Sequence, residues 1–128
     1  MIVDSSAIVA LVFQEPGYER LLDALSSAPS PGIGTPTLAE TAIVLSARLE
    51  HDATALLDRL VGAFGIAIVP FGDAHWREAT DAYWRFGRGR HAAQLNFGDC
   101  LTYAVAKLAD QPLLFVGEDF TRTDLTPA

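Results

Sequence analysis

The chain has 128 residues, half of them hydrophobic, which fits one domain over residues 1–128 and excludes an intrinsically disordered protein. Its net charge of −7 argues against a general electrostatic binder of nucleic acid. The charge is still compatible with an enzyme that holds nucleic acid through metal ions and a local basic patch.

Helices and strands alternate in the secondary structure that the sequence predicts. An apolar strand over residues 1–3 ends at Asp4, and a helix over residues 7–13 follows, which Ser5 or Ser6 can cap. This apolar run is too short to span a bilayer and no basic segment precedes it, so we expect a soluble, cytoplasmic protein with no membrane partner. Further helices are predicted over residues 15–28, 35–50, 53–64, 73–86 and within 95–107, and further strands over residues 66–69 and 113–116. The remaining segments, 29–34 and 87–96, are predicted as loops, the first with at most a short strand.

The alternation is typical of an α/β protein with a mainly parallel sheet. In open sheets of this kind, ligands bind beyond the carboxyl ends of the strands. Asp4 follows the first predicted strand, and Glu118 and Asp119 follow the last. We therefore expect these acids at the same edge of the sheet.

Four acidic residues are candidates for a shared site: Asp4, Glu40, Asp99 and Asp119. Each also has a purely structural explanation. Asp4 could cap the first helix, and Asp119 could belong to a turn. Glu40 stands three residues after Thr37, the spacing of a capping box, and Asp99 has the same spacing from Asn96.

Convergence of the four acids would favour a metal site. Carboxylates placed together repel one another, and a divalent cation relieves that repulsion. Oxygen ligands suit Mg²⁺ or Mn²⁺, and the four motifs contain no histidine, which disfavours zinc. The only cysteine, Cys100, has apolar neighbours and is expected to be a buried, inert thiol. A carboxylate-held cation can generate a hydroxide nucleophile and neutralise charge on a phosphodiester.

Three arginines, Arg85, Arg88 and Arg90, fall within six positions and are assigned to a glycine-containing loop that leads to the last helix. Two interpretations stay open for this loop. It is either simply solvated, or it contacts phosphate groups beside the acidic site. His91 lies in the same loop and could also touch phosphate.

Four sequence blocks, taken together and in this order, resemble a PIN-domain ribonuclease of the VapC toxin type. The blocks are MIVDSSAIVAL, TPTLAETAIVL, GRGRHAAQLNFGDCLTYAVAK and LLFVGEDFTRTDL. They extend from the first residue nearly to the last, and the third is the most specific. The resemblance implies a PIN-like three-layer α/β/α domain with a mainly parallel central sheet.

The resemblance also implies a function and a site. The expected activity is endoribonuclease cleavage of RNA with Mg²⁺ or Mn²⁺, by the toxic component of a toxin–antitoxin pair. Asp4 and Asp99 would be the main metal ligands, Glu40 and Asp119 would complete the site, and Ser6 would support Asp4. Arg88 and Arg90 are the candidate RNA contacts. Expected partners are the RNA substrate, a cognate VapB-type antitoxin and a second copy in a homodimer.

The fourth block departs from the family pattern because two acids are adjacent in it. We assign the functional role to Asp119, which precedes FTRTDL, and treat Glu118 as a bystander and Asp124 as a cap or turn residue. Two other functions stay open. One is a catalytically silent PIN-like binding module, and the other is a phosphoacceptor signalling domain, which would need a lysine after a late strand, whereas Lys107 lies inside a predicted helix.

Overall fold

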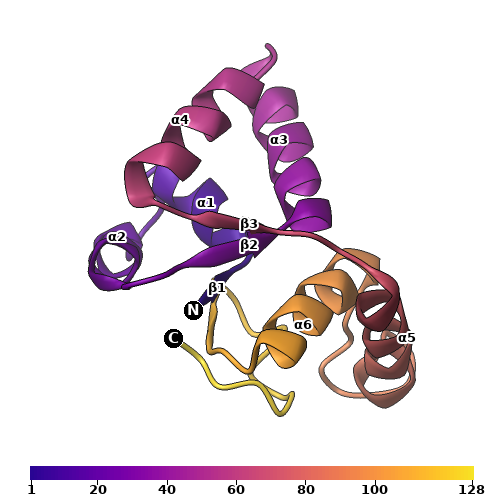
Figure 1. Cartoon of the computed structure of the whole chain (residues 1–128). Helices are drawn as coiled ribbons and strands as arrows, with labels where there is room; N and C mark the ends of the chain where they lie inside the picture. The colour runs from indigo at the N-terminus through magenta and orange to yellow at the C-terminus, as the bar shows by residue number, and fades with distance from the viewer.

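A four-stranded parallel sheet forms the centre of the computed structural model, which describes residues 1–128 (Figure 1). Its strands are β1 (Ile2–Val3), β2 (Gly32–Gly34), β3 (Ala67–Val69) and β4 (Leu113–Leu114), in the spatial order β3-β2-β1-β4. All three pairings are parallel. The helices are α1 (Ser5–Val12), α2 (Tyr18–Ser27), α3 (Thr35–Leu49), α4 (Thr54–Phe64), α5 (Asp73–Phe86) and α6 (Phe97–Ala109). Helical connections are expected here, because parallel neighbours cannot be joined by a tight turn.

The helices cover both faces of the sheet and give three layers. One apolar core joins the sheet to α1, α2, α3 and α4, and a second joins it to α5, α6 and the C-terminal segment. Successive strand residues point to opposite faces, so Val3 and Leu114 lie in the first core, whereas Ile2 and Leu113 lie in the second. The predicted α/β/α architecture is therefore confirmed.

Several element boundaries differ from the prediction for local reasons. The first helix begins at Ser5, because Asp4 and not a serine is its N-cap. Helix α2 begins only at Tyr18, because Gly17 has a φ of +89°, a left-handed conformation that the helix cannot include. The segment predicted as a loop with at most a short strand contains β2, which is an interior strand of the sheet.

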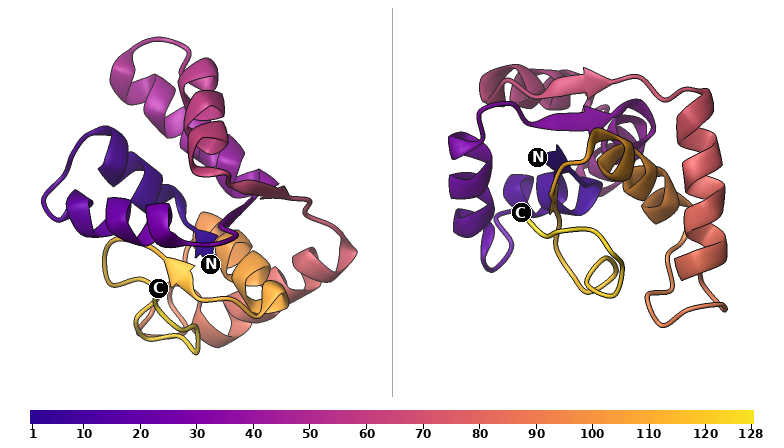
Figure 2. Two further views of the ribbon diagram at one scale, coloured as in Figure 1. Left: turned by 60° about the vertical axis from the view of Figure 1, so that its left-hand side comes forward. Right: turned by 60° about the horizontal axis from the view of Figure 1, so that its bottom comes forward.

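The last predicted strand is also shorter than expected, since β4 ends at Leu114. Two residues later the amide of Val116 donates to Ser6 Oγ at 3.0 Å and not to another strand. The chain then forms the C-terminal loop, residues 115–126, and returns to the sheet, where Pro127 forms a bridge with Leu113. This loop coils beside α6, and the two termini lie close together (Figures 1 and 2).

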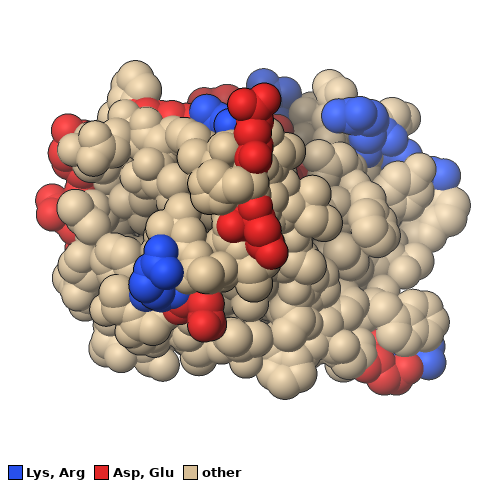
Figure 3. All heavy atoms as spheres, turned by 90° about the horizontal axis from the view of Figure 1, so that it is seen from above, with Lys and Arg blue, Asp and Glu red and all other residues tan.

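None of the helices combines the length and apolar composition that crossing a membrane requires. The surface of the α3 and α4 side is largely uncharged, and its acidic and basic side chains form small separate groups (Figure 3). The acidic side chains on this face thus do not form one continuous negative patch.

Candidate functional site

Asp4 lies directly after β1 and is almost completely buried, with 5% of its surface exposed. Its Oδ2 atom accepts hydrogen bonds from Ser6 N at 3.1 Å and from Ser6 Oγ at 2.6 Å. These bonds offset part of the free energy that burial of a carboxylate costs. Because Ser6 Oγ also accepts from the amide of Val116, one serine joins Asp4 to the segment that follows β4.

Glu40 lies in the second turn of α3 and is held from two sides. Its Oε1 accepts from Ser5 Oγ at 2.9 Å. A Cβ atom at position 98 would lie 2.5 Å from its Oε2, so only the absent side chain of Gly98 leaves room for this carboxylate. The capping-box interpretation with Thr37 is wrong, because the helix begins two residues before Thr37, whose hydroxyl is hydrogen-bonded to Thr102 Oγ1 at 2.9 Å.

Asp99 does form a capping box, at the start of α6. Its amide donates to Asn96 Oδ1 at 2.9 Å, and its Oδ2 accepts from Asn96 N at 3.0 Å. Burial nevertheless raises the pKa of Asp99 to about 6 against the lowering effect of the Asn96 hydrogen bond, and the nearby charges of Asp119, Asp4 and Glu40 raise it further. Asp99 is thus both a helix cap and a member of an acidic group.

Asp119 is exposed and makes no hydrogen bond or ion pair of its own. Its neighbour Glu118 is engaged within the loop, since Thr121 Oγ1 donates to its backbone oxygen at 2.7 Å and approaches its Oε2 at 3.3 Å. Asp119 is the carboxylate with the strongest charge effect on Asp99. The charge effect on Asp99 and the engagement of Glu118 within its own loop both favour Asp119 over Glu118 as the member of the acidic group.

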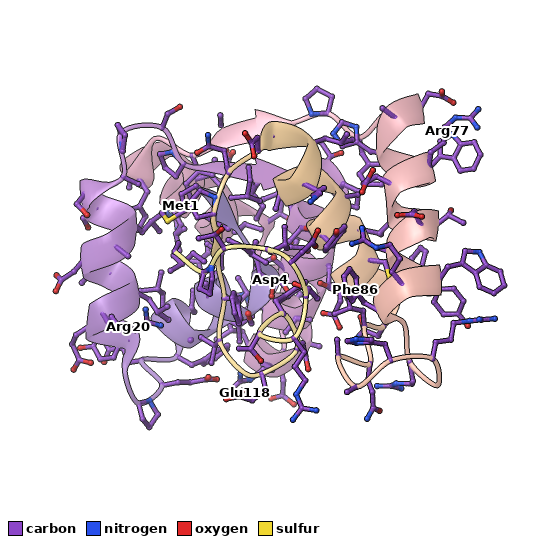
Figure 4. The ribbon with its side chains drawn as sticks, turned by 90° about the horizontal axis from the view of Figure 1, so that it is seen from below. Met1, Asp4, Arg20, Arg77, Phe86 and Glu118 are labelled. Carbon is purple, nitrogen blue, oxygen red and sulfur yellow. The ribbon has the colours of Figure 1, made fainter.

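The four predicted acids thus come from four different segments and converge on one region. In the view of Figure 4, the loop that carries Glu118 passes across the region of Asp4. No three acidic, histidine or cysteine side chains lie close enough to one another to form a closed metal cluster. The donors are all carboxylate oxygens, and this donor set fits Mg²⁺ or Mn²⁺.

The three arginines do not share one location. Arg88 and Arg90 are exposed in the loop before α6, as predicted. The guanidinium of Arg90 lies 3.7 Å from the ring centre of Trp84, a cation–π contact. The assignment of Arg85 to the loop is wrong, because this residue is in the last turn of α5 and binds Asp124 at 3.3 Å.

Two other side chains near the site have structural roles. The Nδ1 atom of His91 is hydrogen-bonded to Ala93 N at 3.0 Å, and its ring packs edge-on against Phe86, so it is tied to its own loop. Cys100 is buried, as predicted, and this burial together with the charge of Asp99 raises the pKa of its thiol to about 11. Cys100 is therefore a neutral thiol at physiological pH.

Asp124 is the important residue that the sequence did not reveal. It accepts hydrogen bonds from Tyr103 Oη and Lys107 Nζ, each at 2.7 Å, and from Arg85 at 3.3 Å. Partial burial opposes ionisation, but the hydrogen bonds from Lys107 and Tyr103 lower the pKa of Asp124 to about 2. The only lysine of the chain is thus paired with this acid, which argues against the phosphoacceptor alternative.

Comparison with known proteins identifies the family of the chain. The PIN domain family profile matches residues 1–125. The chain is 48% identical to ribonuclease VapC36 of Mycobacterium tuberculosis, over 98% of this chain and 91% of the relative. It is 41% identical to ribonuclease VapC of Mycolicibacterium smegmatis, over 98% and 97% of the two chains.

Solved structures show the same fold. The crystal structure of Mycobacterium tuberculosis VapC20, a sarcin–ricin loop cleaving toxin, superposes with a TM-score of 0.78 at 18% identity, over 99% of this chain and 97% of that one. A toxin–antitoxin complex from Klebsiella pneumoniae gives a TM-score of 0.71 at 15% identity, over 96% and 92%. From the match to the profile and the identity with its curated relatives, it follows that the chain belongs to the VapC ribonuclease family of PIN domains.

Proposed function

We propose that this protein is a metal-dependent endoribonuclease and the toxin of a VapBC-type toxin–antitoxin pair. The observation that carries the proposal is the acidic group, in which the charges of Asp119, Asp4 and Glu40 all act on Asp99. Its relatives are ribonucleases by name, and one structural neighbour is described as a toxin that cleaves the sarcin–ricin loop. RNA is the corresponding substrate class, and the cytoplasm is the compartment in which we expect the protein to act.

The proposed metal ligands are Asp4 and Asp99, with Glu40 and Asp119 completing the site. Mg²⁺ or Mn²⁺ bound there would activate water and neutralise negative charge on the phosphodiester. The protein's own contribution is to hold each carboxylate in place before the substrate arrives. Separate hydroxyl and amide donors hold three of the four, namely Ser6 for Asp4, Ser5 for Glu40 and Asn96 for Asp99.

The proposed RNA contacts are Arg88 and Arg90. Both are exposed in the loop that leads into α6, near its Asp99 end. Stacking on Trp84 restricts the Arg90 side chain and reduces the conformational entropy lost when it meets a phosphate. In a chain with a net charge of −7, such a local pair of cations compensates for the unfavourable overall charge.

A homodimer and an antitoxin are the proposed protein partners. Large apolar side chains are exposed between α3, α5 and α6, where Phe97 is 81% exposed, Ile43 69% and Trp76 48%. Grooves of about 600 and 380 Å³ lie on the two sides of Phe97. Exposed apolar patches of this kind mark protein interfaces, and we assign this one to the second copy. The Klebsiella complex is described as a toxin–antitoxin assembly, which supports an antitoxin partner.

The decisive experiment is RNA cleavage by the purified protein across a Mg²⁺ titration, with Asp4→Asn and Asp99→Asn as test variants. Asp58→Asn is a matched control, because Asp58 is exposed on α4 and makes no hydrogen bond or ion pair. We expect cleavage by the wild type and the control only. Folded test variants that cleave at the wild-type rate would contradict the proposal, and sequencing of RNA ends after brief induction would identify the target.

A further inference from the structure

The position of Asp119 depends entirely on the backbone of the C-terminal loop. Its side chain makes no hydrogen bond or ion pair, in contrast to the other three acids of the site. A carboxylate without a partner is placed by the anchors of its own segment. The residues that fix this loop therefore decide how close Asp119 lies to Asp99.

The loop has an anchor on each side of Asp119. Before it, the amide of Val116 donates to Ser6 Oγ at 3.0 Å. Directly after it, the ring of Phe120 is 98% buried in the core that includes α5 and α6, and it packs edge-on against Phe115. Phe120 attaches this span to the apolar core that it shares with α6, but neither anchor makes a polar contact with that helix, which carries Asp99.

Asp124 supplies that connection. Its two carboxylate oxygens receive Tyr103 Oη and Lys107 Nζ at 2.7 Å each, and both donors belong to α6. Arg85 of α5 completes the set and also donates to Tyr103 Oη at 3.3 Å. We call Asp124 and these three donors the Asp124 clamp.

The clamp and the site lie along one face of α6. Asp99, Tyr103 and Lys107 are spaced four residues apart, so each lies one turn beyond the previous one on the same side of the helix. On the C-terminal loop, residues 120–123 separate Asp119 from Asp124, and they include the buried Phe120. The loop and the helix are thus joined one turn away from the point where Asp119 acts on Asp99.

We propose that Asp124 is a positioning residue, which ties the C-terminal loop to α6 and so sets Asp119 against Asp99 for cation binding. The proposal rests on the metal site described under the proposed function. Asp124 does not touch the cation or RNA in this scheme. Its role is to limit the motion of a loop whose acidic side chain has no partner of its own.

The test measures Mg²⁺ affinity by titration calorimetry on the full chain without RNA. Tyr103→Phe removes one hydroxyl and leaves the ring that packs against Phe86. Asp124→Asn removes the charge and keeps the shape. We expect each variant to weaken Mg²⁺ binding roughly three- to tenfold, the range that one lost hydrogen bond of ordinary strength gives. The double variant should bind Mg²⁺ no more weakly than Asp124→Asn alone, because the Tyr103 hydroxyl is expected to act on the loop only through Asp124.

Loop mobility provides a second measurement. Hydrogen exchange of the amides in residues 115–125 should be faster in Tyr103→Phe than in the wild type, because the loop has lost its attachment to the helix. Wild-type exchange and wild-type Mg²⁺ affinity in this variant would overturn the proposal. A lower melting temperature in EDTA together with unchanged Mg²⁺ affinity would also overturn it, since the contact would then be structural only.

Two further variants separate the clamp from general charge effects. Asp58→Asn removes one negative charge from an exposed position on α4, a helix that packs in the other apolar core, and should leave Mg²⁺ affinity nearly unchanged. Lys107→Met removes a positive charge from an exposed helix position. Long-range electrostatics would then strengthen Mg²⁺ binding, whereas loss of the clamp weakens it, so stronger or unchanged binding would contradict our inference.

Asp119→Asn distinguishes failure of this inference from failure of the proposed function. We expect this variant to lose Mg²⁺ affinity more than any clamp variant. If it does while the clamp variants bind normally, only the positioning role of Asp124 is wrong. If Asp119→Asn itself binds Mg²⁺ with wild-type affinity, the assignment of Asp119 to the metal site is wrong, and the positioning role falls with it.

Discussion

Replacement of Asp99 by asparagine should stabilise the protein when no metal is present. Asparagine retains an oxygen that can accept from Asn96 N, so the cap of α6 is kept. What the substitution removes is a carboxylate whose pKa is raised to about 6 by burial and by three neighbouring acids. The variant therefore isolates the energetic effect of the negative charge.

The size and the pH dependence of the effect follow from this raised pKa. Because the folded protein holds the Asp99 proton more tightly than the unfolded chain does, the resulting stabilisation is present below pH 4 and is lost as the pH rises through about 6. The shift corresponds to at most about 3 kcal/mol. Asp99 is only half-buried, so solvent screening reduces the expected effect to about 1 kcal/mol, or roughly 4 °C in melting temperature.

The assay is thermal melting of wild type and Asp99→Asn from pH 4 to pH 7.5 in EDTA, followed by a Mg²⁺ titration at pH 7.5. In EDTA the variant should melt about 4 °C higher at pH 7.5 and at nearly the same temperature at pH 4. Mg²⁺ at ten times its dissociation constant stabilises the wild type by about 1.4 kcal/mol, which should cancel or reverse the difference. Asp58→Asn, the exposed control, should follow the wild type throughout.

Two results would refute this reasoning. A difference in melting temperature that stays constant between pH 4 and pH 7.5 would show that the charge of Asp99 costs no free energy. Equal responses of both proteins to Mg²⁺ would show that Asp99 is a helix cap and not a metal ligand.

The other predictions concern the surroundings of the acidic group. Gly98→Ala should change the melting temperature by no more than a few degrees, because alanine favours the helix. The same change should reduce RNA cleavage strongly, because the new methyl group displaces the Glu40 carboxylate. Unchanged cleavage would mean that the close approach of Glu40 to Gly98 is not functional. Replacing Arg88 and Arg90 by alanine should weaken RNA binding and reduce the slope of log affinity against log salt by roughly 1.4. Arg59→Ala, at an exposed position of α4, should leave the slope unchanged. An unchanged slope in the Arg88/Arg90 variant would identify the loop as merely solvated. If the proposed homodimer forms through this patch, Phe97→Ser should give a monomer in light scattering without loss of folding, and a dimer that persists would place the interface elsewhere.

The sequence predicted the fold well where the signal was local. The bounds of α5 agree with the predicted helix over residues 73–86, because its amphipathic pattern lies between glycines on both sides. The placement of Asp4 at the end of a strand was also predicted from a run of three apolar residues. These features depend on neighbours within a few positions, which a single sequence displays directly.

Other features depended on contacts that no local pattern contains. The pairs Thr37/Glu40 and Asn96/Asp99 have the same spacing, yet only the second is a capping box. In the first, the preceding Gly34 takes the cap position, and the threonine hydroxyl binds a residue 65 positions away. The clamp formed by Asp124 was missed for the same reason, since its contacts span 17 to 39 positions.

The pairing of β1 with β4 has a consequence for when the toxin becomes active during its synthesis. The strand that presents Asp4, β1, pairs with β4, which comes from the far end of the sequence. Ser6 accepts a hydrogen bond from the amide of Val116, two residues after β4. A nascent chain can form α1 to α4 and their core while it is still attached to the ribosome, but it lacks β4 and the loop that carries Asp119. Stalled nascent chains that end before Leu113 should therefore be unable to cleave RNA, whereas release of the finished chain should produce activity within its folding time. The order of the strands thus makes the complete acidic group depend on the C-terminal part of the chain.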